Sequence, residues 1–129
     1  MKKFKILFIL VFFSVFFLFN INVLNSQSKK KIRKFGRLAS EYAKQYFKGQ
    51  KYILVYYKGK GHYRRTLAVV KRLDKETTYN YDVVKDGYAC IYRWAFYPDK
   101  IKKAYNKAKK EKKGLWGLNF DLMRCLCEK

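Results

Sequence analysis

Acidic residues are scarce in this sequence. Its 129 residues include 9 Asp and Glu against 31 Lys and Arg, a formal net charge of +22 at pH 7, and no acidic residue precedes Glu41. Such an imbalance describes the partners of a protein rather than its fold. It predicts binding to nucleic acid, to an anionic membrane surface or to another acidic polymer. The length allows one small domain and no more.

Histidine and cysteine are also rare. His62 is the only histidine, and the three cysteines are Cys90, Cys125 and Cys127. A structural zinc site needs about four such ligands, so the closely spaced cysteine pair is too sparse to form one. An oxidising compartment would permit one disulfide and leave one thiol. The simpler expectation is a small buried Cys90 and a frayed C-terminal tail over residues 118–129.

Residues 1–26 are expected to be a targeting segment. Three lysines lie within the first five residues, and an apolar run interrupted only by Ser14 extends from Ile6 to Phe19. The length lies between that of a signal-peptide core and that of a membrane span, and no clear small-x-small cleavage motif follows. A cleaved signal peptide and an uncleaved anchor through residues 1–24 both stay open. Both place the body outside the cytoplasm, whether periplasmic, secreted or membrane-anchored.

A basic linker is expected over residues 27–34, before a domain over residues 35–117. The linker carries Lys and Arg without any acidic residue, which is typical of a solvated, flexible arm. Beside a membrane it could also contact anionic head groups.

Within the domain, periodicity predicts alternating helices and strands. Apolar residues at i, i+4 and i+8 predict a helix over residues 37–47, and β-branched and aromatic runs predict strands at 51–57 and 65–72. A Lys-Gly-Lys-Gly turn at 58–61 joins the two strands into a hairpin. A short helix is expected over 81–86, and a last one opens at Pro98-Asp99 and ends at Gly114. The last helix has an apolar core stripe and a lysine-rich outer face.

Four segments of this domain resemble the thermonuclease (staphylococcal-nuclease-like) family. YRRTLAV at 63–69 resembles its Y-G-R-x-L-A-Y strand, and Asn80 with VVKDGYA at 83–89 resembles its V-N-x-x-L-V-x-x-G-x-A helix. AKKEKKGLWG at 108–117 resembles its closing A-x-x-x-x-x-G-L-W segment, and residues 36–57 resemble its first helix and the following strand. The order and spacing of all four agree over residues 35–117, which makes the resemblance specific.

The resemblance implies an α+β fold with a five-stranded OB-type β-barrel and about three helices. This chain would hold only the C-terminal half, a partial barrel with the first three strands apparently missing. The resemblance also implies Ca²⁺-dependent hydrolysis of phosphodiester bonds in DNA and RNA. That chemistry needs oxygen ligands for the cation, a carboxylate that positions water and two arginines that neutralise the phosphoryl oxygens.

Several family roles carry over to residues of this sequence. Arg65 matches the second catalytic arginine, and Tyr63 matches a tyrosine that lies against the nucleotide. Family aromatics around the bound base correspond to the region that holds Tyr92 and Trp94. The family has glycine where this chain has Arg64, a change expected to tighten or re-aim the turn. The nucleic-acid-binding candidates are Tyr63, Arg64, Tyr92, Trp94, Lys58 and Lys60. Each candidate also has an ordinary structural explanation: Arg65 as an exposed arginine of a strand, the aromatic residues as part of the core, and the lysines as solvated surface residues.

The departure from the family concerns the catalytic half. The family's metal carboxylates, general-base Glu and first Arg precede the first helix, where this chain has the apolar segment and lysines. The sequence therefore offers no ligands for Ca²⁺, and two strands leave a sheet edge that needs cover. Three hypotheses follow: a nuclease completed by a partner chain, a non-catalytic nucleic-acid-binding module, and a truncated remnant that folds poorly. The low carboxylate count favours the second over the first. We expect sequence-independent binding that weakens steeply with salt.

Overall fold

A computed structural model describes residues 26–92, 95 and 97–128 of the chain. The chain divides into two compact units, Met1–Gly36 and Arg37–Lys129. The predicted signal peptide or anchor therefore lies almost wholly outside the described residues. Of the helices that the structure describes, none is both long enough and apolar enough to cross a bilayer.

The first described element is a helix over residues 26–46. The expectation of a flexible linker over residues 27–34 is wrong, because those residues are helical and exposed. Lys and Arg have good helix propensity, and this stretch contains neither Gly nor Pro to oppose it. The predicted helix at 37–47 therefore begins earlier than expected. It ends before a turn at 47–49, where Gly49 has a φ of 76°.

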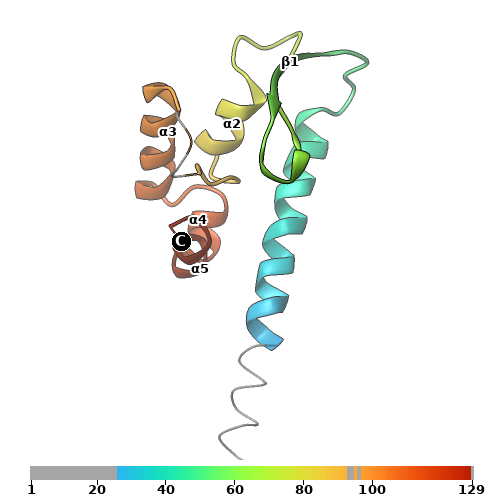
Figure 1. The fold of residues 1–129 in the computed structure, drawn as a ribbon. Coiled ribbons are helices and arrows are strands. Elements are labelled where there is room, and N and C mark those ends of the chain that lie inside the picture. The colour runs from blue at the N-terminus through green and yellow to red at the C-terminus, as the bar shows by residue number, and fades with distance from the viewer. Residues whose placement is uncertain (1–25, 93–94, 96, 129) are drawn as a thin grey trace, which may run out of the picture. The chain divides into compact units, whose positions relative to one another are not determined.

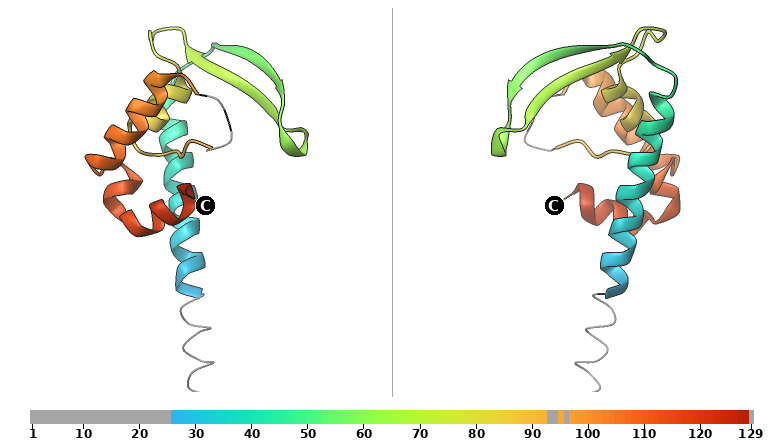
Figure 2. Two further views of the ribbon diagram at one scale, coloured as in Figure 1. Left: turned by 60° about the vertical axis from the view of Figure 1, so that its left-hand side comes forward. Right: turned by 90° about the vertical axis from the view of Figure 1, so that its right-hand side faces the viewer.

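Two antiparallel strands follow, β1 (Ile53–Lys60) and β2 (Thr66–Arg72). The predicted hairpin is confirmed, and Figure 2 shows it as a curved ribbon. The turn lies later than expected, because a register shift between Tyr57 and Gly59 keeps residues 58–60 in β1. The 3-10 turn η1 (His62–Arg64) joins the strands.

Four helices complete the chain: α2 (Tyr79–Lys85), α3 (Asp99–Lys110), α4 (Leu115–Leu118) and α5 (Phe120–Cys127) (Figure 1). Helix and strand together give the expected α+β class. The core of the second unit lies among the helices and is formed by Tyr46, Val84, Ala104, Tyr105, Ala108, Leu115, Trp116 and Met123. The apolar stripe predicted for the last long helix is thus confirmed.

Two glycines of the family-like motifs touch each other's backbone. Gly87 has a φ of 82° and Gly114 a φ of 51°. The N–H of Leu115 donates to the carbonyl oxygen of Gly87 at 3.0 Å. A Cβ atom at Gly87 would collide with the carbonyl of Lys113, and one at Gly114 would collide with that of Asp86. Only glycine allows the end of α2 and the start of α4 to pack this closely.

Residues 120–127 form α5, so the expectation of a frayed tail is wrong for the described C-terminal residues. The side chain of Asn119 accepts a hydrogen bond from the N–H of Leu122 and caps α5. Cys127 forms a disulfide with Cys90, which is exposed rather than buried. Cys125 is the free thiol, and it is exposed. The disulfide ties α5 to the segment after α2 and so holds the end of the chain in place.

Candidate nucleic-acid interface

The structure brings five of the predicted binding residues together at the end of the hairpin. Lys58 and Lys60 lie at the end of β1, Tyr63 and Arg64 lie in η1, and Arg65 leads into β2. All five side chains are exposed, and Tyr63 keeps 79% of its surface accessible. We call these five residues the hairpin tip. The arrangement combines cations with an aromatic face, as phosphate and base contacts require.

Within the hairpin tip, Arg65 and Tyr63 interact directly. The Arg65 guanidinium carbon lies 5.6 Å from the centroid of the Tyr63 ring, which is within the range of a cation–π interaction. The N–H of Gly61 donates to the carbonyl oxygen of Arg65 at 2.8 Å and closes the turn. The pair therefore projects from a hydrogen-bonded turn, with the guanidinium next to the ring.

The backbone of the hairpin tip is left-handed at two residues that are not glycine. Tyr63 has a φ of 59° and Arg64 a φ of 54°. Such a conformation costs roughly 1–2 kcal/mol per residue outside glycine. The family-like motif has glycine at position 64, and the positive φ explains that preference. Arg64 thus adds a cation to the tip, at the cost of an unfavourable backbone conformation.

Asn80 fixes β2, the strand that Arg65 precedes. Its side-chain oxygen accepts from the N–H of Val70 at 2.8 Å, and its side-chain nitrogen donates to the carbonyl oxygen of Ala68 at 3.0 Å. Asn80 lies in α2, so this amide joins the helix to the strand. The motif match at Asn80 gave no role from the sequence alone, and the structure supplies one.

The second predicted aromatic region is only partly visible. Tyr92 is 65% exposed, and its N–H donates to the hydroxyl of Tyr97 at 3.0 Å. Trp94 lies outside the described residues. Tyr92 belongs to the segment before α3 and not to the hairpin tip.

The nine carboxylates, all of which lie in described residues, do not form a metal site. Within the described part of the chain, no three His, Cys, Asp or Glu side chains gather in a way that could hold a metal ion. Most carboxylates instead accept from cations or hydroxyls of the fold. Their ion-pair partners include Arg37 for Glu41, Arg72 for Asp74, Lys113 for Glu111 and Arg124 for Asp121. The Ca²⁺ that the family implies does not fit this set of residues.

Asp82 is the only buried charged residue among those described, with 2% of its surface exposed. It accepts hydrogen bonds from the hydroxyls of Tyr46 and Thr77 at 2.7 Å each and from the ammonium of Lys85 at 3.2 Å. Burial alone would raise the pKa of Asp82. The bonds from Thr77, Tyr46 and Lys85 outweigh burial and hold this pKa below its ordinary value. The carboxylate is therefore ionised and fully engaged in the fold.

A second pair of the same kind lies one helical turn away. The hydroxyl of Tyr42 donates to Asp86 at 2.7 Å. Burial, and then this hydrogen bond, raise the pKa of Tyr42 well above its usual range. Residues four apart share one helix face, so Tyr42 and Tyr46 meet Asp86 and Asp82 in antiparallel order. Sequence reasoning missed these pairs, although the matched i, i+4 spacing of tyrosines and aspartates was a usable signal.

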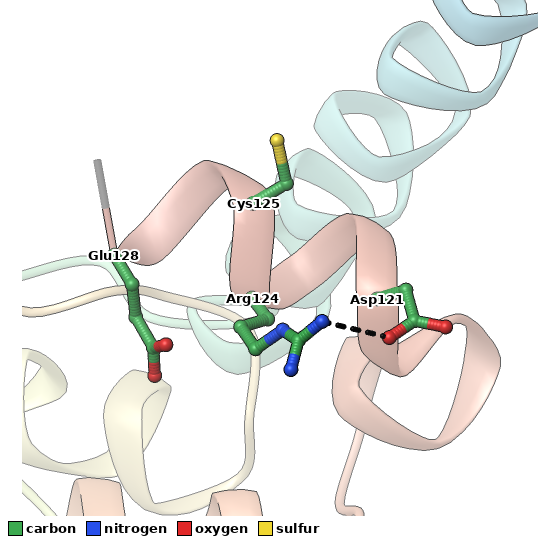
Figure 3. A pocket seen from close by; sticks show the side chains of 4 residues that line it. All are labelled: Asp121, Arg124, Cys125 and Glu128. Carbon is green, nitrogen blue, oxygen red and sulfur yellow. Dashed lines mark hydrogen bonds and ion pairs between the residues drawn. The ribbon is translucent and has the colours of Figure 1, made fainter.

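A hollow lies on the surface at α5. It is lined by Asp121, Arg124, Cys125 and Glu128 (Figure 3). Arg124 pairs with Asp121 at 3.4 Å, and Glu128 pairs with Lys109 outside the hollow. Its charges are thus largely compensated by partners in the fold. The hairpin tip remains the better candidate for a polyanion.

Comparison with known proteins gives one match. The sequence profile of the family described as staphylococcal nuclease homologue matches residues 15–117. The match ends at Gly117, where the resemblance seen in the motifs also ends, and it begins earlier than residue 35. No curated protein and no solved structure matches this chain.

Proposed function

Because the chain belongs to the family of staphylococcal nuclease homologues, we propose that it binds nucleic acid through the hairpin tip, without base specificity. The observation that carries this proposal is the exposed cluster of Lys58, Lys60, Tyr63, Arg64 and Arg65 on one turn. No Asp or Glu occurs between Glu41 and Asp74. The hairpin therefore presents positive charge that no carboxylate of its own neutralises.

Each tip residue has a separate role in the proposed complex. Arg65 contacts phosphate oxygens in a bidentate manner, which the planar guanidinium favours. Tyr63 offers its exposed face for stacking with a base, a contact that tolerates any sequence. Lys58, Lys60 and Arg64 follow the backbone and release counterions on binding.

Hydrolysis is the activity that the family implies, and it needs more than the hairpin tip supplies. Arg65 alone can stabilise charge on a phosphoryl group, but water activation needs a carboxylate. Most carboxylates of this chain bind cations or hydroxyls of the fold, and none is gathered into a metal site among the described residues, so we place binding, and not cleavage, as its primary function. The partial OB-type barrel inferred from the resemblance stays a prediction.

The test measures anisotropy of a labelled single-stranded DNA of mixed sequence with the full-length protein in mild detergent. Arg65→Ala should weaken binding. It should also reduce the slope of the logarithm of the binding constant against the logarithm of the salt concentration by about 0.7, which corresponds to the loss of one phosphate contact on a single strand. Tyr63→Ala should weaken binding about tenfold, whereas Tyr63→Phe, which keeps the ring, should bind normally. Lys103→Ala, an exposed charge on α3, is the matched control. Equal losses for Lys103→Ala and Arg65→Ala would reject the tip as the site.

Cleavage is checked in the same samples with Ca²⁺ or with EDTA. Ca²⁺-dependent cleavage that disappears in Arg65→Ala would show that the protein is a nuclease, with a metal site that its carboxylates form in another arrangement than the one described. Circular dichroism of each variant separates a loss of binding from a loss of folding. A wild-type protein that is unfolded would support the remnant hypothesis instead.

We also propose that the body functions outside the cytoplasm. The Cys90–Cys127 disulfide is typical of oxidising compartments, and the basic and apolar start of the sequence is typical of an export signal. Cell fractionation and the mass of the native protein test this proposal and distinguish a cleaved signal from an uncleaved anchor.

A further inference from the structure

The sheet of the described chain has two edges, and only one of them is covered. On the outer side of β2, Asn80 bonds to Val70 and Ala68, and Lys71 forms a bridge with Thr78. On the outer side of β1 no strand lies among the described residues, since the sheet has two strands. The edge of β1 is therefore the place where a further strand could pair.

The register shows which main-chain groups this edge presents. In an antiparallel pair, residues opposite each other alternate between pairs that exchange hydrogen bonds and pairs that do not. Val70 and Ala68 direct a main-chain N–H and C=O, respectively, toward Asn80, away from β1. Their partners in the register are Val55 and Tyr57. Val55 and Tyr57 must then direct their own N–H and C=O groups outward, along the open edge.

The side chains of β1 fit the same interpretation. Val55 is 56% exposed and Tyr57 is 62% exposed, and the apolar residues between and before them are exposed by 40% or more. Successive side chains of a strand point to opposite faces, so both faces of β1 carry uncovered apolar surface. A nucleic acid cannot match a ladder of amide donors and carbonyl acceptors, whereas an extended polypeptide can.

Charge decides which polypeptide fits. Lys51, Lys58 and Lys60 flank the apolar part of β1 and are exposed, and the hairpin contains no carboxylate. A second copy of this chain, with a net charge of +22, would bring like charges together at the shared edge. An acidic strand would place carboxylates opposite these lysines, and opposite charges across a strand pair are stabilising.

We propose that the outer edge of β1 is a docking site for an extended, acidic polypeptide segment, which adds a third strand to the sheet. The main-chain groups of Val55 and Tyr57 supply the hydrogen bonds, and the flanking lysines select carboxylates. This site shares Lys58 and Lys60 with the hairpin tip, but its main-chain hydrogen bonds come from Val55 and Tyr57, and it does not depend on nucleic-acid binding.

The test uses full-length protein and a labelled synthetic peptide of alternating glutamate and valine. The expected result is saturable binding that the same peptide with lysine for glutamate does not show. An acidic peptide that is N-methylated at every residue keeps its charge but offers no main-chain N–H at either edge, so it should not bind either. Equal binding of all three peptides, or of the acidic and N-methylated peptides, would overturn the proposal.

A proline variant locates the site. Val55→Pro removes an outward N–H while leaving the β1–β2 ladder intact, and it should weaken peptide binding about tenfold or more. Val55→Thr keeps that N–H and should bind normally. DNA binding should persist in both variants, which separates this proposal from the proposed function.

Amide hydrogen exchange of the wild-type protein gives a readout that needs no variant. Hydrogen exchange at the amides of Val55 and Tyr57 should become slower when the acidic peptide is added. Protection that is already present without peptide, together with a dimeric mass, would mean that a second copy occupies the edge. Protection produced by DNA and not by the peptide would assign the edge to nucleic acid.

Discussion

The buried carboxylate of Asp82 gives the sharpest test of how this fold is held together. Asp82→Ala removes the acceptor of two hydroxyl donors and one ammonium donor. The hydroxyl of Tyr46 then has no acceptor in a residue that is only 7% exposed, which costs roughly 1–3 kcal/mol. The half-exposed Thr77 loses about 1 kcal/mol, and Lys85 returns to water at little cost. We therefore expect Asp82→Ala to lower the free energy of unfolding by about 3 kcal/mol.

Asp82→Asn should cost less, because the amide oxygen can still accept from the two hydroxyls. Charge-assisted hydrogen bonds are then replaced by weaker neutral ones, which should lower the free energy of unfolding by about 1–2 kcal/mol. The matched control is Asp121→Ala, whose carboxylate is 86% exposed and pairs only with Arg124 among the ion pairs of the described chain. Exposed pairs of this kind contribute about 0–1 kcal/mol. Urea unfolding followed by circular dichroism measures all three variants.

The pH dependence has a defined sign. The pKa of Asp82 is lower in the folded protein than in the unfolded chain. Its stabilising contribution is therefore fully present above the unfolded value of about 3.9 and is lost as the pH falls through the folded value. The difference in stability between wild type and Asp82→Asn should shrink when unfolding is repeated in acid. An Asp82→Ala variant no less stable than Asp121→Ala, or a difference that does not change with pH, would refute this reasoning.

Three further changes have expected outcomes that thermal or urea unfolding can check. Gly114→Ala should cost about 3 kcal/mol or more, because it combines a positive φ with a collision against backbone carbonyls; a loss below about 1 kcal/mol would contradict the packing. Cys127→Ser opens a disulfide loop with a sequence separation of 37 and should cost about 4 kcal/mol, whereas Cys125→Ser should be neutral and should abolish the thiol titrated with a chromogenic disulfide. Trp116→Phe should cost only about 1 kcal/mol, because the indole N–H has no hydrogen-bond partner in the described structure; a loss as large as that of Trp116→Ala would show that the N–H is bonded.

Secondary structure was predictable wherever the local sequence pattern agrees with the packing of the folded chain. Strand β2 lies within one residue of the predicted bounds, because alternation defines it locally. Helix α3 begins at the predicted Pro-Asp start but ends at Lys110, before the predicted end at Gly114. The stretch 27–34 was predicted incorrectly because its charge was read as disorder, while its helix propensity was high. The C-terminal helix was missed because the disulfide that holds it joins residues far apart in sequence.

The candidate site was predictable in composition but not in geometry. The resemblance identified Arg65 and Tyr63, and the structure places the guanidinium of Arg65 near the ring of Tyr63. The glycine that the family motif has at position 64 led to the expectation of an altered turn, and the positive φ of Arg64 gives the geometry that the sequence alone did not specify. The hydrogen bonds from Tyr42 and Tyr46 of the first helix to Asp86 and Asp82 were also not predicted. They join residues 44 and 36 positions apart, so the matched spacing was a signal only once the two helices were known to pack together.

The distribution of carboxylates connects stability with function in this chain. A protein with nine carboxylates and 31 cations cannot neutralise every surface, so where it places the few acids determines where positive charge remains. Asp82 and Asp86 fasten the first helix to α2, and Asp74 neutralises Arg72 at the base of the hairpin. None lies farther along the hairpin, so the positive charge at its tip and along the edge of β1 has no carboxylate of the hairpin beside it. The placement of the acids that stabilises the helices therefore leaves the hairpin positively charged, as both the proposed nucleic-acid binding and the proposed acidic strand require.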